Sequence, residues 1–261
     1  VKDELLLFRR KCYESLYLIA TYEMKTRPDD MLVMLFSGVP GIGKSFFSLY
    51  FMIQVMLDRD FPTKECFYEF YEGVYDKYTY IESKLTVSED NPNQWTAKLT
   101  LRTQKCYEIN CKSDLVLSDL RDAKEPRYNG RWTCIFSSPN PARYRQIMNV
   151  PNRYHFTMPT WSQEELQFVN CDVDNWYERF VTFGGVPRYV LWNGNGTDPS
   201  RVLEEALSSK GAVVAEYFFT KGFGDIDPNK SYMLVHINPP FMPDKGDWDY
   251  LGLGIHSFAS Y

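Results

Sequence analysis

The feature that most constrains the fold of this chain is a glycine-rich segment, residues 38–45 (GVPGIGKS), set between two apolar runs. Residues 31–36 (MLVMLF) form a short apolar run bounded by turn residues, which predicts a strand buried on both faces. Residues 44–57 are apolar nearly all round and predict a helix buried on more than one side. A glycine turn between a buried strand and a buried helix indicates an α/β fold.

The glycine segment matches the pattern G-x-x-x-x-G-K-[ST] at every fixed position. Glycines allow positive φ and close approach to a phosphate, and the backbone N–H groups and helix dipole attract an anion. We expect Lys44 to reach the β- and γ-phosphates and Ser45 to bind Mg²⁺. The expected ligands are therefore a nucleotide and Mg²⁺, bound by Gly38, Pro40, Gly41, Ile42, Gly43, Lys44, Ser45 and Phe46.

The nucleotide is expected to be ATP. Guanine specificity normally rests on an Asn-Lys-x-Asp loop, and the single Asn-Lys pair, Asn229-Lys230, lacks the Asp. This absence favours adenine over guanine.

The remaining segments predict an N-terminal helix, then mainly strands, and then mainly helices. Residues 1–25 have helical apolar spacing, with Arg9, Arg10 and Lys11 on another face. Residues 66–109 alternate aromatic and polar side chains, as in antiparallel hairpins. Further strands are expected at 114–119, 131–138 and near 231–240, and helices at 163–168, 174–183 and 201–207.

These elements predict two parts with a boundary near Pro159. Residues 1–160 are expected to form a P-loop NTPase core with an N-terminal helix, a central, mostly parallel sheet and a β-hairpin-rich insertion. Residues 161–261 are expected to form a helical subdomain and a C-terminal strand leading toward a further domain. Because the chain starts at Val1 and shows no signal peptide, we expect it to be a piece of a longer protein.

The second half of the expected site lies on later strands. P-loop NTPases hold Mg²⁺ with a carboxylate at the end of a neighbouring strand, and Asp119 is the candidate, with Asp114 and Asp122 as rivals. Hydrolytic relatives often carry an acid directly after this Asp, but Leu120 stands there. Either another carboxylate acts as base or hydrolysis is slow.

Two further groups could act on the γ-phosphate. The strand at 131–138 runs into polar residues that could orient the attacking water, namely Ser137, Ser138 and Asn140. An arginine could stabilise charge in the transition state. Arg188 is favoured over Arg143 and Arg145 because the pair Gly184-Gly185 makes a tight turn before it. The expected catalytic set is Lys44, Asp119, Ser138 and Arg188.

Composition narrows the function. The 261 residues suffice for one large or two small domains, and 44% of them are hydrophobic. A net charge of −5 provides no broad footprint for nucleic acid, and the longest apolar run, 46–57, is too short to cross a bilayer, so no membrane partner is expected. The six Cys are scattered without a CxxC pair and there are three His, so free buried thiols are expected and a zinc site is not.

Four stretches in order and spacing resemble the NTPase module of the Crinkler effectors and retrotransposon hot spot proteins. They are FSGVPGIGKSFFSLYF (36–51), SSPNPARY (137–144), YHFTMPTWSQEEL (154–166) and FGGVPRYVLW (183–192). RKCYESLYLI (10–19) and SYMLVHINPP (231–240) also look similar, so the resemblance covers nearly the whole chain.

The resemblance implies an ASCE-type P-loop ATPase, distantly similar to AAA+ and STAND ATPases, in which Asp119 binds Mg²⁺. Leu120 stands where the family usually has glycine. The family module commonly precedes a nuclease domain, and no nuclease constellation is visible in this chain. Crinklers are secreted and act in host cells, in the nucleus or cytoplasm, on cell death or immunity, whereas trypanosome hot spot proteins are nuclear.

Three functions remain open at this point, the last of them a nucleotide-gated DNA-binding element supported by the clusters Arg127-Tyr128 and Arg143-Tyr144-Arg145 alone. The chain could be an ATPase that couples hydrolysis to remodelling or to a partner domain. Alternatively, it could be a catalytically weak binding module in which ATP supports a homo-oligomer or contact with a host protein or DNA. Leu120 favours the second, and the intact glycine segment and Arg188 favour the first.

Overall fold

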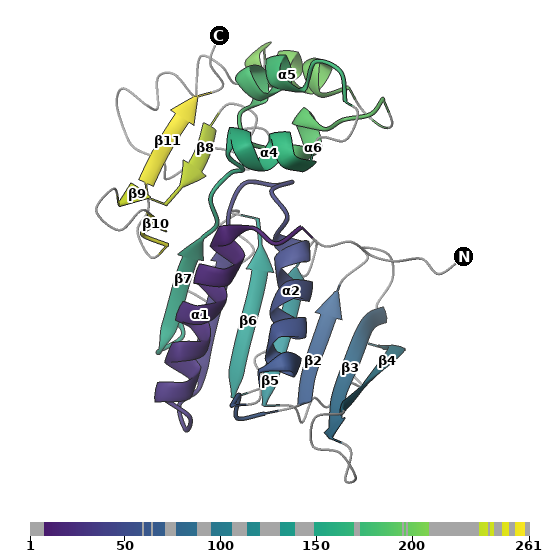
Figure 1. Cartoon of the computed structure of the whole chain (residues 1–261), viewed down its shortest axis with the longest axis vertical. Helices are drawn as coiled ribbons and strands as arrows, with labels where there is room; N and C mark the ends of the chain where they lie inside the picture. The colour runs from purple at the N-terminus through teal and green to yellow at the C-terminus, as the bar shows by residue number, and fades with distance from the viewer. Residues whose placement is uncertain are drawn as a thin grey trace. The chain divides into compact units, whose positions relative to one another are not determined.

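The computed structural model has an α/β fold (Figure 1). It describes residues 8–58, 60–63, 65–70, 77–87, 95–105, 114–120, 131–138, 149–169, 173–194, 196, 198–208, 235–239, 241–242, 247–250 and 254–258. The chain forms two compact units. The first contains residues 1–37 and 44–156, and the second contains residues 38–43 and 157–261.

A seven-stranded sheet in the order β4-β3-β2-β5-β6-β1-β7 organises the first unit. The strands β2, β5, β6 and β1 are parallel, while β3 is antiparallel to β2 and β4 is antiparallel to β3. Their bounds are β1 Leu32–Ser37, β2 Glu65–Phe70, β3 Lys77–Val87, β4 Trp95–Lys105, β5 Leu115–Leu120, β6 Trp132–Ser137 and β7 Arg153–Thr157. The expected strands at 31–36, 114–119 and 131–138 and the hairpin β3–β4 are therefore confirmed.

The helices α1 (Lys11–Thr26) and α2 (Lys44–Leu57) cover one face of this sheet (Figure 1). Between them and the strands lies a core of aromatic rings centred on Phe36 of β1. Its ring lies 5.1 Å from that of Phe136, 5.0 Å from that of Phe156 and 5.2 Å from that of Phe47. The strands β1 and β6 are buried along their whole length. Both faces of these strands are therefore covered, as is usual in parallel sheets.

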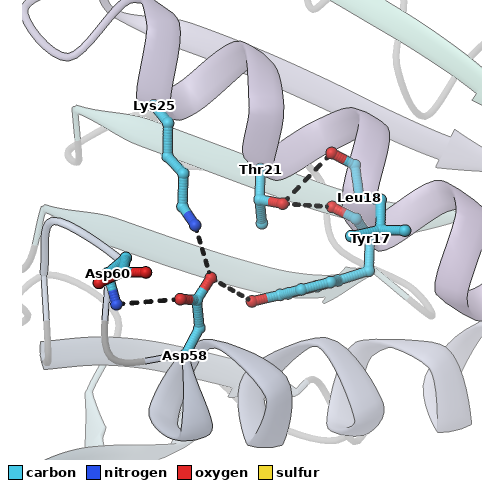
Figure 2. Close-up of polar contacts among 6 residues, drawn as sticks. All are labelled: Tyr17, Leu18, Thr21, Lys25, Asp58 and Asp60. Atoms are coloured by element: carbon cyan, nitrogen blue, oxygen red, sulfur yellow. Dashed lines mark hydrogen bonds and ion pairs between the residues drawn. The ribbon is translucent and has the colours of Figure 1, made fainter.

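A polar cluster joins the two helices at the C-terminal end of α2, the end far from the glycine segment (Figure 2). Lys25 Nζ lies 2.8 Å from Asp58 Oδ2, and the Tyr17 hydroxyl donates to the same oxygen at 3.3 Å. The backbone N–H of Asp60 donates to Asp58 Oδ1 at 3.0 Å. Asp58 follows α2 directly, so this carboxylate ties the end of α2 to α1.

The expectations for the first helix need correction. The described chain from Phe8 to Arg10 precedes α1, because Arg10 has extended backbone (φ −76°, ψ 147°). Arg10 does not lie on a polar face but is 1% exposed, with its guanidinium 5.7 Å from the Tyr13 ring centroid. A planar, weakly hydrated guanidinium can be buried against an aromatic ring, which periodicity alone does not indicate.

The helix at 44–57 has the expected bounds and, as expected, is buried on more than one side, while one stripe of it is exposed. Phe46, Ile53 and Leu57 are 50%, 42% and 43% exposed, and they lie on one stripe of α2. Two other features were missed. The strand β7 was not expected, and β2 belongs to the parallel part of the sheet as well as to the hairpin region, because it pairs with β5.

The described part of the second unit contains several short helices. It contains α4 (Gln163–Val169), α5 (Trp176–Phe183), α6 (Pro187–Val190) and a helix at 199–208, so the three expected helices are present. The Ser162 hydroxyl accepts from the Glu165 N–H and the Glu165 carboxylate accepts from the Ser162 N–H, a capping box that starts α4. The described residues of this unit also form two strand pairs, β8 (Val235–Asn238) with β11 (Gly254–Phe258), and β9 (Phe241–Met242) with β10 (Asp247–Trp248).

The two compact units differ from the two expected parts of the chain in one respect. The chain passes between the units after Phe156, near the expected boundary at 160, but residues 38–43 group with the second unit rather than with the strand and helix that flank them. The glycine segment therefore makes its contacts with residues far along the chain.

Candidate functional site

The glycine loop, residues 38–43, has the backbone that its sequence predicts. Gly38, Gly41 and Gly43 have φ of +150°, +90° and +99°, values that side-chain-bearing residues rarely adopt. A Cβ atom on Gly38 would lie 2.9 Å from the Met158 carbonyl oxygen, so close approach also requires glycine there. The expected positive φ at the loop glycines is confirmed.

Trp161 makes hydrogen bonds both to the glycine loop and to the turn at Gly185. Its indole Nε1–H donates to the Ile42 carbonyl at 2.8 Å, and its backbone N–H donates to the Gly185 carbonyl at 2.8 Å. A Cβ on Gly185 would lie only 1.9 Å from the Trp161 carbonyl oxygen. The two glycine segments, 38–43 and 184–185, are therefore linked through one side chain and its backbone.

Arg188 lies against the same loop. It sits in the first turn of α6, after a turn in which Gly184 has φ +62° and its carbonyl accepts from the Val186 N–H at 2.9 Å. A Cβ on Gly41 would lie 2.8 Å from Arg188 Cβ and 3.2 Å from Arg188 Nε. The arginine is exposed, so its guanidinium is accessible beside the loop. Burial raises the pKa of the neighbouring Tyr189, and the charge of Arg188 opposes this shift.

Lys44 and Ser45 open α2 directly after the loop and are both half-buried, whereas Phe46 is exposed. The first turn of α2 carries no acidic side chain of its own, and the positive end of the helix dipole lies there. The Ser45 carbonyl accepts from the Ser48 hydroxyl at 2.7 Å, and Ser48 Oγ lies 2.9 Å from the Tyr68 hydroxyl. These bonds connect the start of α2 to β2.

Asp119 is the next-to-last residue of β5 and is 5% exposed. In the sheet, Asp119 pairs with Phe136 of β6, and Phe136 pairs with Phe36 of β1. Asp119 therefore lies near the carboxyl edge of the sheet, where β1 ends and the loop begins. The rival Asp114 precedes β5 at the opposite edge, where it pairs with Arg131 at 3.9 Å. The carboxyl edge is where open α/β sheets bind ligands, so geometry favours Asp119.

Hydroxyl groups line the same edge of the first unit. Ser137 ends β6, is 1% exposed, and its Oγ has no hydrogen-bond partner within the described ranges. Ser138 follows it and is half-buried.

Ser37 ends β1, and its Oγ lies 2.6 Å from His155 Nε2. Burial lowers the pKa of His155, so this imidazole is neutral at pH 7.

The structure thus brings the expected residues together in two groups. The loop 38–43 contacts Arg188 in the second unit, while Lys44, Ser45, Asp119 and Ser137 belong to the first. Several expected residues lie outside the described part of the chain, namely Asp122, Arg127, Tyr128, Asn140, Arg143, Tyr144, Arg145, Asn229 and Lys230.

Within the described ranges, no group of three or more His, Cys, Asp and Glu side chains could hold a metal ion. Cys12, Cys66 and Cys134 are buried and form no disulfide within the part of the chain that the structure describes. Among the described helices, none combines the length and the apolar character needed to span a bilayer.

Sequence reasoning missed two residues of this region, Trp161 and His155. Each makes its contact with a partner more than 100 positions away, as the separations of 119 for Trp161–Ile42 and 118 for His155–Ser37 show. Local spacing carries no signal for such pairs. The nearest signal is a tryptophan directly after Pro159-Thr160, at the point where the sheet pattern ends.

Comparisons with protein-family models, with curated proteins and with solved structures produced no match to this chain.

Proposed function

We propose that this chain is a P-loop NTPase of the ASCE type that binds ATP with Mg²⁺ and hydrolyses its γ-phosphate. The observation that carries the proposal is the glycine loop. Three of its glycines have positive φ, a buried parallel strand precedes it, and Lys44 and Ser45 follow at the start of a helix. Backbone N–H groups at such a strand–loop–helix junction are the usual cradle for phosphates.

The donor set fits Mg²⁺. This ion takes oxygen ligands, keeps several waters and is usually held by one or two carboxylates together with substrate phosphates. The Ser45 hydroxyl and the Asp119 carboxylate supply such oxygens, and a cluster of three acidic groups is not required. When bound, the ion would neutralise charge on the β- and γ-phosphates.

The chain's own residues would then act as follows. Lys44 and the loop N–H groups would hold the β- and γ-phosphates, and the Asp119 carboxylate at the edge of β5 would hold the ion. The strand β6 lies between β1 and β5, so its terminal Ser137 and the following Ser138 stand between the strand that enters the loop and the strand that carries Asp119. A hydroxyl there can orient the attacking water. Arg188, beside Gly41, can stabilise charge that develops on the phosphoryl group.

The biological setting of the proposal rests on the family resemblance. By that resemblance the chain is part of a secreted Crinkler-type effector that acts in the nucleus or cytoplasm of host cells. It would assemble as a homo-oligomer, and the full-length protein would contact a host protein or nucleic acid.

A second function is favoured by one observation. Leu120, the last residue of β5, follows Asp119 where many hydrolases carry an acid that activates water. A chain lacking that acid could bind ATP tightly and turn it over slowly. Its output would then be nucleotide-dependent assembly rather than hydrolysis.

Steady-state phosphate release with ATP and Mg²⁺ separates the two functions. If the chain is a hydrolase, the wild type should release phosphate and should prefer ATP to GTP. This turnover should be lost in Lys44→Ala and in Asp119→Ala. Equal, slow phosphate release from the wild type and Lys44→Ala contradicts hydrolysis. If Lys44-dependent ATP binding and assembly persist in that case, the binding module is the function.

A further inference from the structure

Trp161 contacts both segments that the proposed site uses within the second unit. Its indole donates to Ile42 in the glycine loop, and its backbone donates to Gly185 in the turn before Arg188. The side chain is half-buried, so this donor is partly shielded from water. Neither contact is close in sequence, and neither belongs to a helix or a strand ladder.

The bond to Ile42 sets the direction of a loop N–H group. In a trans peptide the C=O and N–H point in opposite directions from one plane. When the indole holds the Ile42 carbonyl toward Trp161, the N–H of Gly43 points away from Trp161. Gly43 has φ +99° and no side chain, so the indole bond to the Ile42 carbonyl is a contact that orients this peptide.

The turn on the other side of Trp161 is fitted as tightly. Gly185 has no room for a Cβ, because that atom would lie 1.9 Å from the Trp161 carbonyl oxygen. Three residues later Arg188 packs against Gly41, where an added Cβ would lie 2.8 Å from Arg188 Cβ. The path from Ile42 through Trp161 and Gly185 to Arg188 returns to the loop and closes a ring of contacts.

We propose that Trp161 is a positioning residue that couples the glycine loop to Arg188. The coupling works in both directions. Phosphates bound by the loop hold the Ile42–Gly43 peptide in place, and through Trp161 this favours the position of the turn that carries Arg188. The inference rests on the proposed nucleotide-binding function but adds a residue and a route that the motif does not contain.

The first test is Trp161→Phe, which keeps an aromatic ring and removes the indole N–H. Trp176→Phe is the matched control, since Trp176 starts α5 in the same unit and contacts the Tyr177 ring. With a fluorescent ATP analogue, Trp161→Phe should weaken binding about fivefold, as expected for one hydrogen bond. Trp176→Phe should bind as the wild type does.

A spectroscopic readout tests whether the Trp161 indole responds to bound nucleotide. ATP should change the tryptophan emission of the wild type and of Trp176→Phe, and this change should be lost in Trp161→Phe. An ATP-dependent change of the same size in Trp161→Phe would overturn the assignment.

The coupling to Arg188 requires a double-mutant cycle. If the two residues act through one route, Trp161→Phe should weaken ATP binding less in the Arg188→Ala background than in the wild type. Independent, multiplicative effects would overturn the coupling.

Hydrogen exchange on the wild-type chain keeps the proposal testable should Trp161→Phe fail to fold. ATP should slow exchange in the peptides covering 38–45 and 184–190 together. Protection of the loop alone overturns the inference while leaving the proposed function in place. Absence of any ATP binding that depends on Lys44 overturns both.

Discussion

The two ends of α2 serve different purposes. The first turn follows the glycine loop, carries Lys44 and Ser45, and has no acidic side chain of its own. The other end is closed by Asp58, which accepts from Lys25, Tyr17 and the Asp60 N–H (Figure 2). One helix thus carries Lys44 and the positive end of its dipole at the edge where the site is proposed, and a hydrogen-bonded carboxylate at its other end. We expect variants at the two ends to affect different properties.

Two lysines test this difference most strongly. Lys44→Ala should lower ATP turnover at least about 100-fold, as for removal of one group that stabilises transition-state charge, and should leave the unfolding midpoint near that of the wild type. Lys25→Ala should leave turnover unchanged and lower the free energy of unfolding by about 0.5–1 kcal/mol, because its ion pair is partly solvated. Phosphate release and urea unfolding of both variants check this. An equal loss of turnover in the two would remove the distinction.

Asp58→Asn should give the largest loss of stability at the far end. It removes the charge that Lys25 and Tyr17 contact, and the expected decrease in unfolding free energy is about 1–2 kcal/mol. Asp60→Asn is the matched control, because Asp60 contributes its backbone N–H and its side chain is exposed. The control should stay within about 0.5 kcal/mol of the wild type in urea titrations. Similar losses in both variants would contradict the assigned role of Asp58.

The pH dependence of stability should show two separate windows. At the loop end, burial lowers the pKa of His155, so its contribution is present above about pH 6.5 and is lost as pH falls toward the lowered value. At the far end, burial raises the pKa of Asp58 but the bonds from Lys25, the Asp60 N–H and Tyr17 outweigh it. The Asp58 contribution is therefore present above about pH 4 and is lost below it.

Variants assign each window. His155→Gln should remove the decrease in unfolding free energy that begins near pH 6.5, and Asp58→Asn should remove the one that begins near pH 4. Denaturant unfolding from pH 7 to pH 3 measures both. A wild-type profile that is flat between pH 7 and pH 5 would contradict the role of His155.

The smallest expected effect is that of Tyr17→Phe. It removes one hydroxyl that donates to Asp58 and keeps the ring that packs against Phe51, so unfolding should lose about 0.5–1 kcal/mol. Tyr22→Phe, on the exposed face of the same helix, should have no measurable effect. Thermal unfolding of the two variants compares them. A larger loss in Tyr22→Phe would indicate that the exposed face of α1 contributes more than the polar cluster.

Elements with a strong local pattern could be predicted from the sequence. The strand β1, the helix α2 and the positive φ of the loop glycines follow from an apolar run, a glycine pattern and a second apolar run that are adjacent in the chain. The strand β7 could not be predicted, because it is short and only its last two residues, Phe156 and Thr157, are buried. The burial of Arg10 was missed for a related reason, since a charged residue is ordinarily assigned to the surface.

The candidate site divides in the same way. The motif indicated the loop, Lys44 and Ser45, and strand patterning indicated Asp119 and Ser137. Asp119 and the rival Asp114 lie at opposite ends of β5 and therefore at opposite edges of the sheet, and the carboxyl edge favours Asp119. Trp161 and His155 became visible only through their partners.

The sequence by itself determined the local conformation of the loop and the elements that flank it. Backbone φ, capping and apolar periodicity depend on neighbouring residues, and these act over a few positions. The tertiary structure alone decided what the loop touches. The contacts of Ile42 with Trp161 and of Gly41 with Arg188 join residues more than 100 positions apart, and they depend on how strands and turns pack rather than on any spacing along the chain.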